Sequence, residues 1–208
     1  MARINAFEQH SDAYDEWFDK NAEAYAAELE AIRQLLPNAG ARGLEIGVGS
    51  GKFAVPLGIS VGVEPSPEMA AKARALGIDV HSGVAEQLPF AAGEFDFTLM
   101  VTTICFVDDA VQSFREALRV LKPGGCLLVA FVDKESELGR TYQANRSSSR
   151  FYQQATFFST RELLSHLETA GFGNTTIKQT LIPGAARNRV ADGFGEGAFV
   201  VIKAIKEA

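Results

Sequence analysis

The hydrophobic positions of this chain alternate between a helical spacing of three or four residues and short apolar runs. These patterns predict where its helices and strands lie. From Ser11 to Leu36, apolar residues recur every three or four positions, which predicts one or two helices that end before Pro37. Short apolar runs follow, separated by turns and by further helical patterns, and such alternation is typical of an α/β protein with a parallel sheet. The predicted strands are 43–46, 60–64, 79–82, 95–101 and 126–132, and the predicted helices are 65–77 and 110–121.

The pattern changes after Val132. Residues 133–158 turn polar, although they carry several aromatic side chains, and a helix is predicted from Ser159 to Gly171. Two last strands, at 175–182 and 197–205, flank a loop rich in Gly and Arg. This arrangement predicts a β-hairpin at the edge of the sheet.

Composition narrows the classes of partner. The 208 residues are 47% hydrophobic and contain no apolar run near the roughly 20 residues of a membrane helix. The N-terminus lacks the apolar stretch of a signal peptide, so we expect a cytoplasmic protein that does not bind a membrane. The net charge is −6 and no basic run reaches five residues, which argues against nucleic acid. Cys105 and Cys126 both lie in apolar runs, so we expect free thiols.

The turn after the first strand is the strongest candidate for a ligand site. Gly47, Gly49 and Gly51 alternate there, and glycines let backbone N–H groups approach a ligand without a Cβ in the way. A P-loop is excluded, because Ile46 and Phe53 occupy positions where that motif needs Gly and Ser or Thr. A dinucleotide turn remains open, since its glycine spacing can be matched. Glu45 favours a different ligand, because a carboxylate would repel a pyrophosphate but attract an α-amino group.

A second acid follows the next strand. Glu64 stands at the carboxyl end of the strand, directly before a helix that Ser66 can cap and Pro67 can open. A carboxylate in this position can accept hydrogen bonds from both hydroxyls of a ribose. The competing interpretation is that Glu64 only stabilises the dipole of the helix. Both a dinucleotide and any other nucleoside cofactor would accept this acid.

Three segments, together with Glu64 after the second strand, resemble class I S-adenosylmethionine (SAM)-dependent methyltransferases. Glu45-x-Gly47-x-Gly49-x-Gly51 resembles motif I of that family, residues 83–90 resemble its G-D-A-E-x-L-P-F segment, and 121–125 resemble its L-K-P-G-G turn. The likeness extends over about residues 42–172. It implies a doubly wound, mostly parallel seven-stranded α/β sheet with helices on both faces and an antiparallel C-terminal pair. It also implies one domain, with a helical cap at 1–40, a cofactor-binding core at 41–132, a lid at 133–158 and a C-terminal part at 159–208.

The resemblance assigns a role to each candidate site residue. The glycine turn and Glu45 would hold the methionine end of SAM, Glu64 the ribose, and residues 83–90 would flank the adenine. The cofactor-binding set it implies is Glu45, Gly47, Gly49, Gly51, Glu64, Pro65, Met69, Ala85, Glu86 and Thr102. The aromatic residues expected around the substrate are Tyr14, Trp17, Phe18, Tyr25, Tyr142 and Tyr152.

Departures from the family pattern limit the expected chemistry. Val84 stands where an Asp is common, and Thr102-Thr103-Ile104 replaces the Asn/Asp-Pro-Pro-aromatic motif of enzymes that methylate nucleic-acid amines. Cys105 lacks the flanking residues of a cytosine-C5 nucleophile, and His81 has no partner at metal-ligand spacing, so no metal is expected. We therefore expect a methyltransferase acting on a small molecule, with no catalytic residue identified. An NAD(P)-dependent oxidoreductase and a non-catalytic SAM-binding domain are the alternatives.

Overall fold

One mixed sheet organises the molecule, which is described by a computed structural model covering residues 5–186 and 188–207. The strand order is β3-β2-β1-β4-β5-β8-β6-β7. The first five strands pair in parallel, whereas β8 pairs antiparallel with both β5 and β6. The strands are β1 (Gly43–Ile46), β2 (Val61–Val63), β3 (Asp79–His81), β4 (Phe95–Val101), β5 (Leu121–Val132), β6 (Gly173–Thr180), β7 (Ala191–Asp192) and β8 (Phe199–Ile205).

This topology confirms the predicted doubly wound α/β class with an antiparallel C-terminal pair. The register pairs Thr176 of β6 with Lys203 of β8, as the predicted hairpin requires. The two-residue strand β7 adds an eighth strand to the seven expected, through pairs with Lys178 and Gln179 of β6. A strand of two residues is too short to show a period of two in the sequence.

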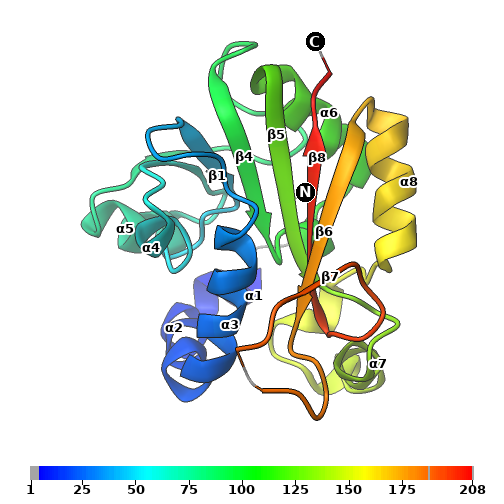
Figure 1. Cartoon of the computed structure of the whole chain (residues 1–208). Helices are drawn as coiled ribbons and strands as arrows, with labels where there is room; N and C mark the ends of the chain where they lie inside the picture. The colour runs from blue at the N-terminus through cyan, green and yellow to red at the C-terminus, as the bar shows by residue number, and fades with distance from the viewer. Residues whose placement is uncertain (1–4, 187, 208) are drawn as a thin grey trace.

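Helices cover both faces of the sheet and one of its ends (Figure 1). In that view α1, α2 and α3 lie at the lower left, α7 lies at the lower right, α6 lies near the top and α8 lies along the right-hand side. The helix α7 falls inside the predicted polar lid and was not expected as a helix. The helices are α1 (Asn5–Gln9), α2 (Ser11–Lys20), α3 (Ala22–Arg33), α4 (Ala54–Leu57), α5 (Pro67–Ala75), α6 (Ala110–Val120), α7 (Glu137–Ala144) and α8 (Thr160–Ala170), with 3-10 turns at Ile104–Phe106, Arg146–Ser148 and Tyr152–Gln154.

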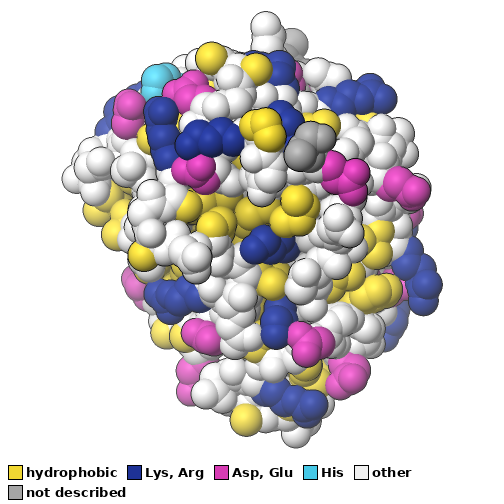
Figure 2. Space-filling view, turned by 45° about the horizontal axis from the view of Figure 1, so that its top comes forward, with side chains coloured by type: hydrophobic (Ala, Val, Ile, Leu, Met, Phe, Trp, Pro, Cys, Tyr) yellow, Lys and Arg dark blue, Asp and Glu magenta, His cyan; other side chains and the backbone are white. Residues whose placement is uncertain are grey.

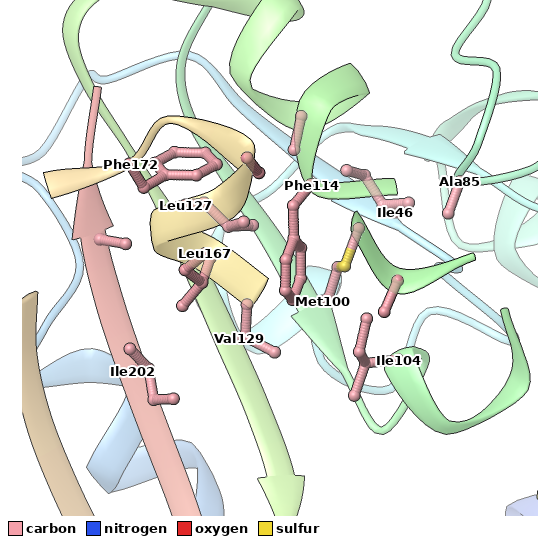
Figure 3. Close-up of a cluster of buried hydrophobic side chains, with 14 of the residues drawn as sticks. Ile46, Ala85, Met100, Ile104, Phe114, Leu127, Val129, Leu167, Phe172 and Ile202 are labelled. Atoms are coloured by element: carbon pink, nitrogen blue, oxygen red, sulfur yellow. The ribbon is translucent and has the colours of Figure 1, made fainter. Parts of the chain in front are cut away.

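Alternate residues of the central strands feed two hydrophobic cores. On β5, Leu127 and Val129 face a core shared with α6 and α8, while Leu128 and Ala130 face a core shared with α3 and α5. Figure 3 shows Phe114 of α6 inserted among side chains of the first core. The phenyl ring of Phe114 is fully buried. Burial on both sides explains why these strands read as nearly continuous apolar runs in the sequence.

The helix ends follow the capping signals of the sequence. The Ser66 hydroxyl accepts a hydrogen bond from the backbone N–H of Met69 (3.4 Å), with Pro67 as the first residue of α5. Asp109 caps α6 in the same way, accepting from the N–H of Gln112 (2.9 Å). These caps satisfy backbone donors that have no partner within their helices. They fix where α5 and α6 begin, next to the carboxyl ends of the strands.

The surface is mixed in charge. On the face in Figure 2, Lys and Arg side chains are interspersed with Asp and Glu. No helix within residues 5–186 or 188–207 combines the length and apolar character needed to cross a membrane. Cys105 and Cys126 are thiols and not halves of a disulfide, as predicted, and burial raises the pKa of the Cys126 thiol.

Candidate active site

The glycine turn lies where the strand order reverses. β1 pairs with β2 on one side and with β4 on the other, and ligands of open α/β sheets bind at the carboxyl ends of strands at such a point. Gly47, Gly49 and Gly51 all have positive φ, at 74°, 56° and 86°. The N–H groups of Gly47 and Val48 donate to the carbonyl of Val63, which anchors the turn to β2. Only glycine adopts this sequence of dihedrals without strain.

Two of these glycines also lie too close to neighbouring groups for any side chain. A Cβ on Gly47 would lie 2.5 Å from side-chain atoms of Thr103, and one on Gly51 would lie 2.7 Å from Ile78. A Cβ on Gly49 would meet nothing closer than the Met69 methyl group at 3.5 Å. The turn is therefore pressed against β4 and α5 and presents its backbone to the space in front of Gly49. The helix after the turn, α4, has only four residues.

Glu64 connects the turn to the second strand. One carboxylate oxygen accepts from the N–H of Gly49 (2.9 Å) and the other from the N–H of Ser66 (3.0 Å). Burial raises the pKa of this carboxyl, and the two backbone N–H groups oppose that rise. Each oxygen has further lone pairs, so Glu64 can still accept hydrogen bonds from a ligand.

Glu45 is buried behind the turn rather than exposed in front of it. The side chain is 2% exposed, and its Oε2 atom has no hydrogen-bond partner. Burial, followed by the nearby Glu64 carboxylate, raises its pKa well above the usual range, while the Ala54 backbone N–H acts in the opposite direction. A buried carboxyl oxygen without a partner fits a ligand that supplies a donor or a positive charge.

A cavity of about 370 Å³ opens in front of Gly49 and Glu64. This volume lies within the usual range of small-molecule sites. Aromatic and apolar side chains form most of its wall. The residues that line it come from the N-terminal helices, from the loops at the carboxyl ends of the strands, and from the segment 138–152. They include Phe7, Tyr14, Trp17, Phe18, Glu28, Gly47, Gly49, Glu64, Pro65, Met69, Ala85, Glu86, Thr102, Phe106, Tyr142, Phe151 and Tyr152.

Most of the residues predicted for the cofactor and the substrate meet in this cavity. Glu45 and Gly51 do not line it, because one lies behind the turn and the other packs against Ile78. Tyr25 is also outside: its ring packs on Phe53, and its hydroxyl donates to the carbonyl of Lys52. The other thirteen predicted residues line the cavity: Gly47, Gly49, Glu64, Pro65, Met69, Ala85, Glu86, Thr102, Tyr14, Trp17, Phe18, Tyr142 and Tyr152.

The strand β4 ends in an unusual backbone conformation at the cavity. Thr102 has a φ of 52°, which is uncommon for a residue other than glycine. Its N–H donates to the carbonyl of Ala130 on β5 (2.8 Å). Strained residues of this kind cluster at functional sites. The position of Thr102 beside the glycine turn agrees with that tendency.

The aromatic wall joins two segments that are far apart in the sequence. Tyr142 of α7 stacks on Tyr152 with ring centroids 5.0 Å apart, and Tyr152 is parallel to Phe106 at 6.1 Å. Phe151 packs against Phe7 and Tyr14 of the N-terminal helices, at 5.4 and 6.1 Å. The predicted cap and lid therefore touch each other over the cavity.

Polar contacts fasten α2 to the cofactor region. Lys72 of α5 donates to Asp12 (2.6 Å) and Asp15 (2.9 Å) of α2. Asp15 in turn accepts from the hydroxyl of Ser50 in the glycine turn (2.6 Å). The helix that supplies Tyr14 and Phe18 to the aromatic wall is thus bonded directly to the turn that precedes α4.

Glu28 is the charged residue of the cavity that sequence reasoning missed. This side chain of α3 lines the cavity and is only 6% exposed, and burial alone raises its pKa to about 8. A signal was present in the sequence, since Glu28 lies three residues after Tyr25 and four before Ile32, on the apolar face of its helix. An acid on such a face is unusual and points to a buried carboxyl.

The segment 83–90 borders the same cavity. Gly83, Val84, Ala85 and Glu86 line it, and Glu86 accepts hydrogen bonds from the N–H groups of Asp108 (2.6 Å) and Asp109 (3.2 Å). The Glu86 carboxylate is therefore held toward α6, leaving the backbone and the Val84 side chain to contact a ligand. Within the described part of the chain, no group of His, Cys, Asp and Glu side chains could hold a metal ion.

Known proteins share this fold. Residues 44–129 match the family model of the methyltransferase domain. A SAM-dependent methyltransferase of Thermotoga maritima is 48% identical, covers 98% of this chain and 100% of its own, and superimposes with a TM-score of 0.93. A protein of Methanocaldococcus jannaschii is 41% identical over 98% of this chain and 100% of its own length. A Haloferax volcanii methyltransferase in complex with the activator Trm112 has a TM-score of 0.74 at 18% identity, covers 100% of this chain and 99% of its own, and shows the fold alone.

The chain belongs to the SAM-dependent methyltransferases of class I. It is an enzyme of that family, and SAM is its cofactor. The residues present fit SAM, because the glycine turn presents its backbone to the cavity at Gly49, and because Glu64 lines the cavity with lone pairs that can accept hydrogen bonds from a ribose. This membership sets aside the oxidoreductase alternative.

Proposed function

We propose that this methyltransferase acts on a small-molecule acceptor held in the aromatic half of the cavity. The observation that carries this proposal is the contact between Phe151 and Tyr14, through which the lid and the cap enclose the space in front of the cofactor turn. An acceptor enclosed in this way has to be small. The mixed surface charge and the net charge of −6 give no support to a polyanionic acceptor.

Within this proposal, each part of the site has one task. Glu64 accepts hydrogen bonds from the ribose of SAM, the glycine turn and Glu45 hold its methionine end, and residues 83–86 flank the adenine. SAM supplies an activated methyl group on a sulfonium. The chain mainly has to align the acceptor for in-line displacement and exclude water, which is the purpose we assign to the lid.

The Thermotoga maritima relative favours the same class of acceptor. That protein is described as a "possible histamine N-methyltransferase", and histamine is a small molecule. At 48% identity over nearly the whole chain, the two proteins share their overall fold. The likeness supports the size class of the acceptor.

Hydrogen exchange tests the proposal. Amides of Tyr14 to Tyr25 and Tyr142 to Phe158 should gain protection when S-adenosylhomocysteine (SAH) binds, because the ligand orders the cap and lid. The helix α8, on the far face of the sheet, serves as the internal control. Unchanged exchange in both segments would reject the lid. Salt-sensitive binding of RNA or DNA, with a slope indicating several phosphate contacts, would overturn the small-molecule acceptor.

A further inference from the structure

Glu28 is the cavity carboxylate that the cofactor does not explain. The charged side chains that line the cavity are Glu28, Glu64 and Glu86, and no Lys, Arg or His from the described residues lines it. The Glu64 carboxylate accepts hydrogen bonds from two backbone N–H groups. The Glu86 carboxylate accepts from the backbone N–H groups of Asp108 and Asp109. Among the described residues, by contrast, none donates a hydrogen bond to Glu28. A buried carboxyl group with no protein partner can accept a hydrogen bond or a positive charge from a ligand.

The surroundings of Glu28 belong to the acceptor half of the cavity. Burial raises the pKa of Tyr142, and the Glu28 carboxylate is the charge that adds to this rise. Glu28 also adds to the raised pKa of Tyr152, although burial and three other groups contribute more. Both rings belong to the stacked pair that closes the cavity from the lid side. Glu28 therefore faces the space enclosed by aromatic rings, next to the residues that we assign to the acceptor.

We propose, building on the function above, that the acceptor is an amine, bound as its ammonium cation by Glu28 inside the aromatic wall. A carboxylate and several ring faces attract the same ligand, because aromatic quadrupoles favour cations. A neutral acceptor would lack the charge that attracts the Glu28 carboxylate, and an anionic acceptor would be repelled by it. The proposal assigns Glu28 two tasks, which are to select a cationic nitrogen and to accept its proton.

The proton has to leave before nitrogen can act as a nucleophile. It passes from the ammonium nitrogen to a carboxylate oxygen of Glu28, and the freed lone pair forms the N–CH₃ bond. The C–S bond breaks as this bond forms, its electron pair stays on sulfur, and the products are SAH and an N-methylammonium ion. Glu28 returns its proton to water when the product leaves. Burial suits this role, because a carboxyl with a pKa of about 8 accepts a proton from an ammonium group more readily than an ordinary one.

Calorimetry with three matched probes tests the assignment. The probes are phenethylammonium, 2-phenylethanol and 3-phenylpropionate, each titrated into protein saturated with SAH. Wild type should bind the cation at least tenfold more tightly than the alcohol and should bind the carboxylate least. Glu28→Gln should lose the preference for the cation, since a charge-assisted hydrogen bond changes affinity by about tenfold or more. Glu30→Gln is the matched control on the same helix, because Glu30 bonds Gln34 and does not line the cavity.

Proton release provides a second readout that does not depend on activity. At pH 7 the empty site keeps the Glu28 proton, so phenethylammonium should displace about one proton from wild type. The phenols of Tyr14, Tyr25, Tyr142 and Tyr152 all have raised pKa values, so they release none, and Glu64 is already engaged by SAH. Binding heats measured in buffers of different ionisation enthalpy give the number of protons released. Glu28→Gln should release no proton.

The outcomes separate this inference from the function on which it rests. Equal cation affinity in Glu28→Gln and wild type would overturn the role of Glu28, and a wild-type preference for the alcohol or the carboxylate would overturn the amine class. Either result leaves a small-molecule methyltransferase in place. If the protein binds SAH but none of the three probes, the amine assignment fails. If hydrogen exchange then shows no lid closure either, the proposed function fails with it.

Discussion

Glu64 accepts a hydrogen bond from the backbone N–H of Gly49 over 2.9 Å, so the acid after the second strand holds the glycine turn after the first. The other carboxylate oxygen accepts from Ser66 at the start of α5. One side chain thus joins two loops that are separate in the sequence. Any ligand that bonds Glu64 is presented to both loops at once.

Replacing Glu64 by Gln is expected to lower SAH affinity at least tenfold. The amide keeps the shape, but it loses the charge-assisted acceptors and turns an NH₂ toward a backbone N–H. Each such bond contributes about 1.5–3 kcal/mol. Calorimetry with SAH measures the loss, and Glu68→Gln, in the first turn of α5, is the control. Unchanged affinity in a folded Glu64→Gln protein would mean that the acid serves the helix dipole alone.

SAM and SAH should stabilise the fold, whereas NAD(H) should not. A ligand at a hundredfold excess over its dissociation constant adds about 2.7 kcal/mol to the free energy of unfolding. A thermal-shift series with SAM, SAH, NAD and NADH compares the ligands directly. A rise in Tm with NADH and none with SAH would contradict the cofactor roles assigned to Glu64 and Glu45.

Gly47 and Gly58 offer a matched test of the turn. Both have φ near 70°, but a Cβ at Gly47 would meet Thr103, whereas a Cβ at Gly58 would meet nothing within 4 Å. Gly58→Ala should therefore cost about 1–2 kcal/mol from backbone strain alone. Gly47→Ala should cost more and should also weaken SAH binding. Urea unfolding and calorimetry separate the two effects, and equal losses in the two variants would exclude the contact with Thr103 as a cause.

The stability of the protein should fall as pH rises between about 4.5 and 8, in part because of Glu28. Burial raises the pKa of this carboxyl from 4.5 to about 8, so in that window the folded state keeps a proton that the unfolded state has lost. The contribution of Glu28 to the free energy of unfolding is therefore complete below pH 4.5 and is lost above pH 8. Between these values it falls by up to about 1.4 kcal/mol per pH unit. Glu28→Gln removes it.

Denaturant melts at pH 5, 6, 7 and 8 measure this effect. Relative to wild type, Glu28→Gln should become progressively more stable toward pH 8, whereas Glu30→Gln should follow wild type. Glu45 and Glu64 also have raised pKa values, but they are present in all three proteins and cancel in the differences. Parallel curves for Glu28→Gln and wild type would show that this carboxyl titrates normally.

Phe114→Ala should destabilise the protein by about 3–5 kcal/mol without changing the cofactor site. The ring is fully buried in the core between α6 and the sheet (Figure 3), so its loss leaves a cavity. Phe114 does not line the ligand cavity. SAH affinity measured well below the midpoint of unfolding should stay within about twofold of wild type. A loss below 1 kcal/mol would mean that α6 repacks over the gap.

The cofactor half of the site and most of the fold could be predicted from the sequence, because local sequence signals determine both. Apolar runs fix the strands, Ser66 and Asp109 fix helix starts, and positive φ requires glycine at 47, 49 and 51. The acceptor half has no such rules. Tyr142 and Phe7 meet only through tertiary packing, and α7 is hidden in a polar stretch whose one clear signal is the Ser136 cap.

Glu28 shows why long-range burial is hard to predict. An acid in a charged helix is normally solvated, and only the register of α3 against the sheet places this one inside. Tyr25 shows the opposite case, because its aromatic character suggested a substrate contact but its ring packs on Phe18 and Phe53. In both cases the role depends on which side of the helix faces the cavity. The sequence shows which residues share a side of the helix, but it does not show against which part of the sheet that side packs.

The bonds between Lys72 and the two aspartates of α2 connect the cofactor region to the helix that carries Tyr14 and Phe18, so we expect binding of the cofactor and of the acceptor to be coupled. The donor side and the acceptor wall cannot tighten independently, because Asp15 bonds both Lys72 and Ser50. Thermodynamic reciprocity then applies: by whatever factor SAH improves binding of the acceptor, the acceptor improves binding of SAH by the same factor. These bonds are partly exposed ion pairs, so that coupling should weaken as ionic strength rises.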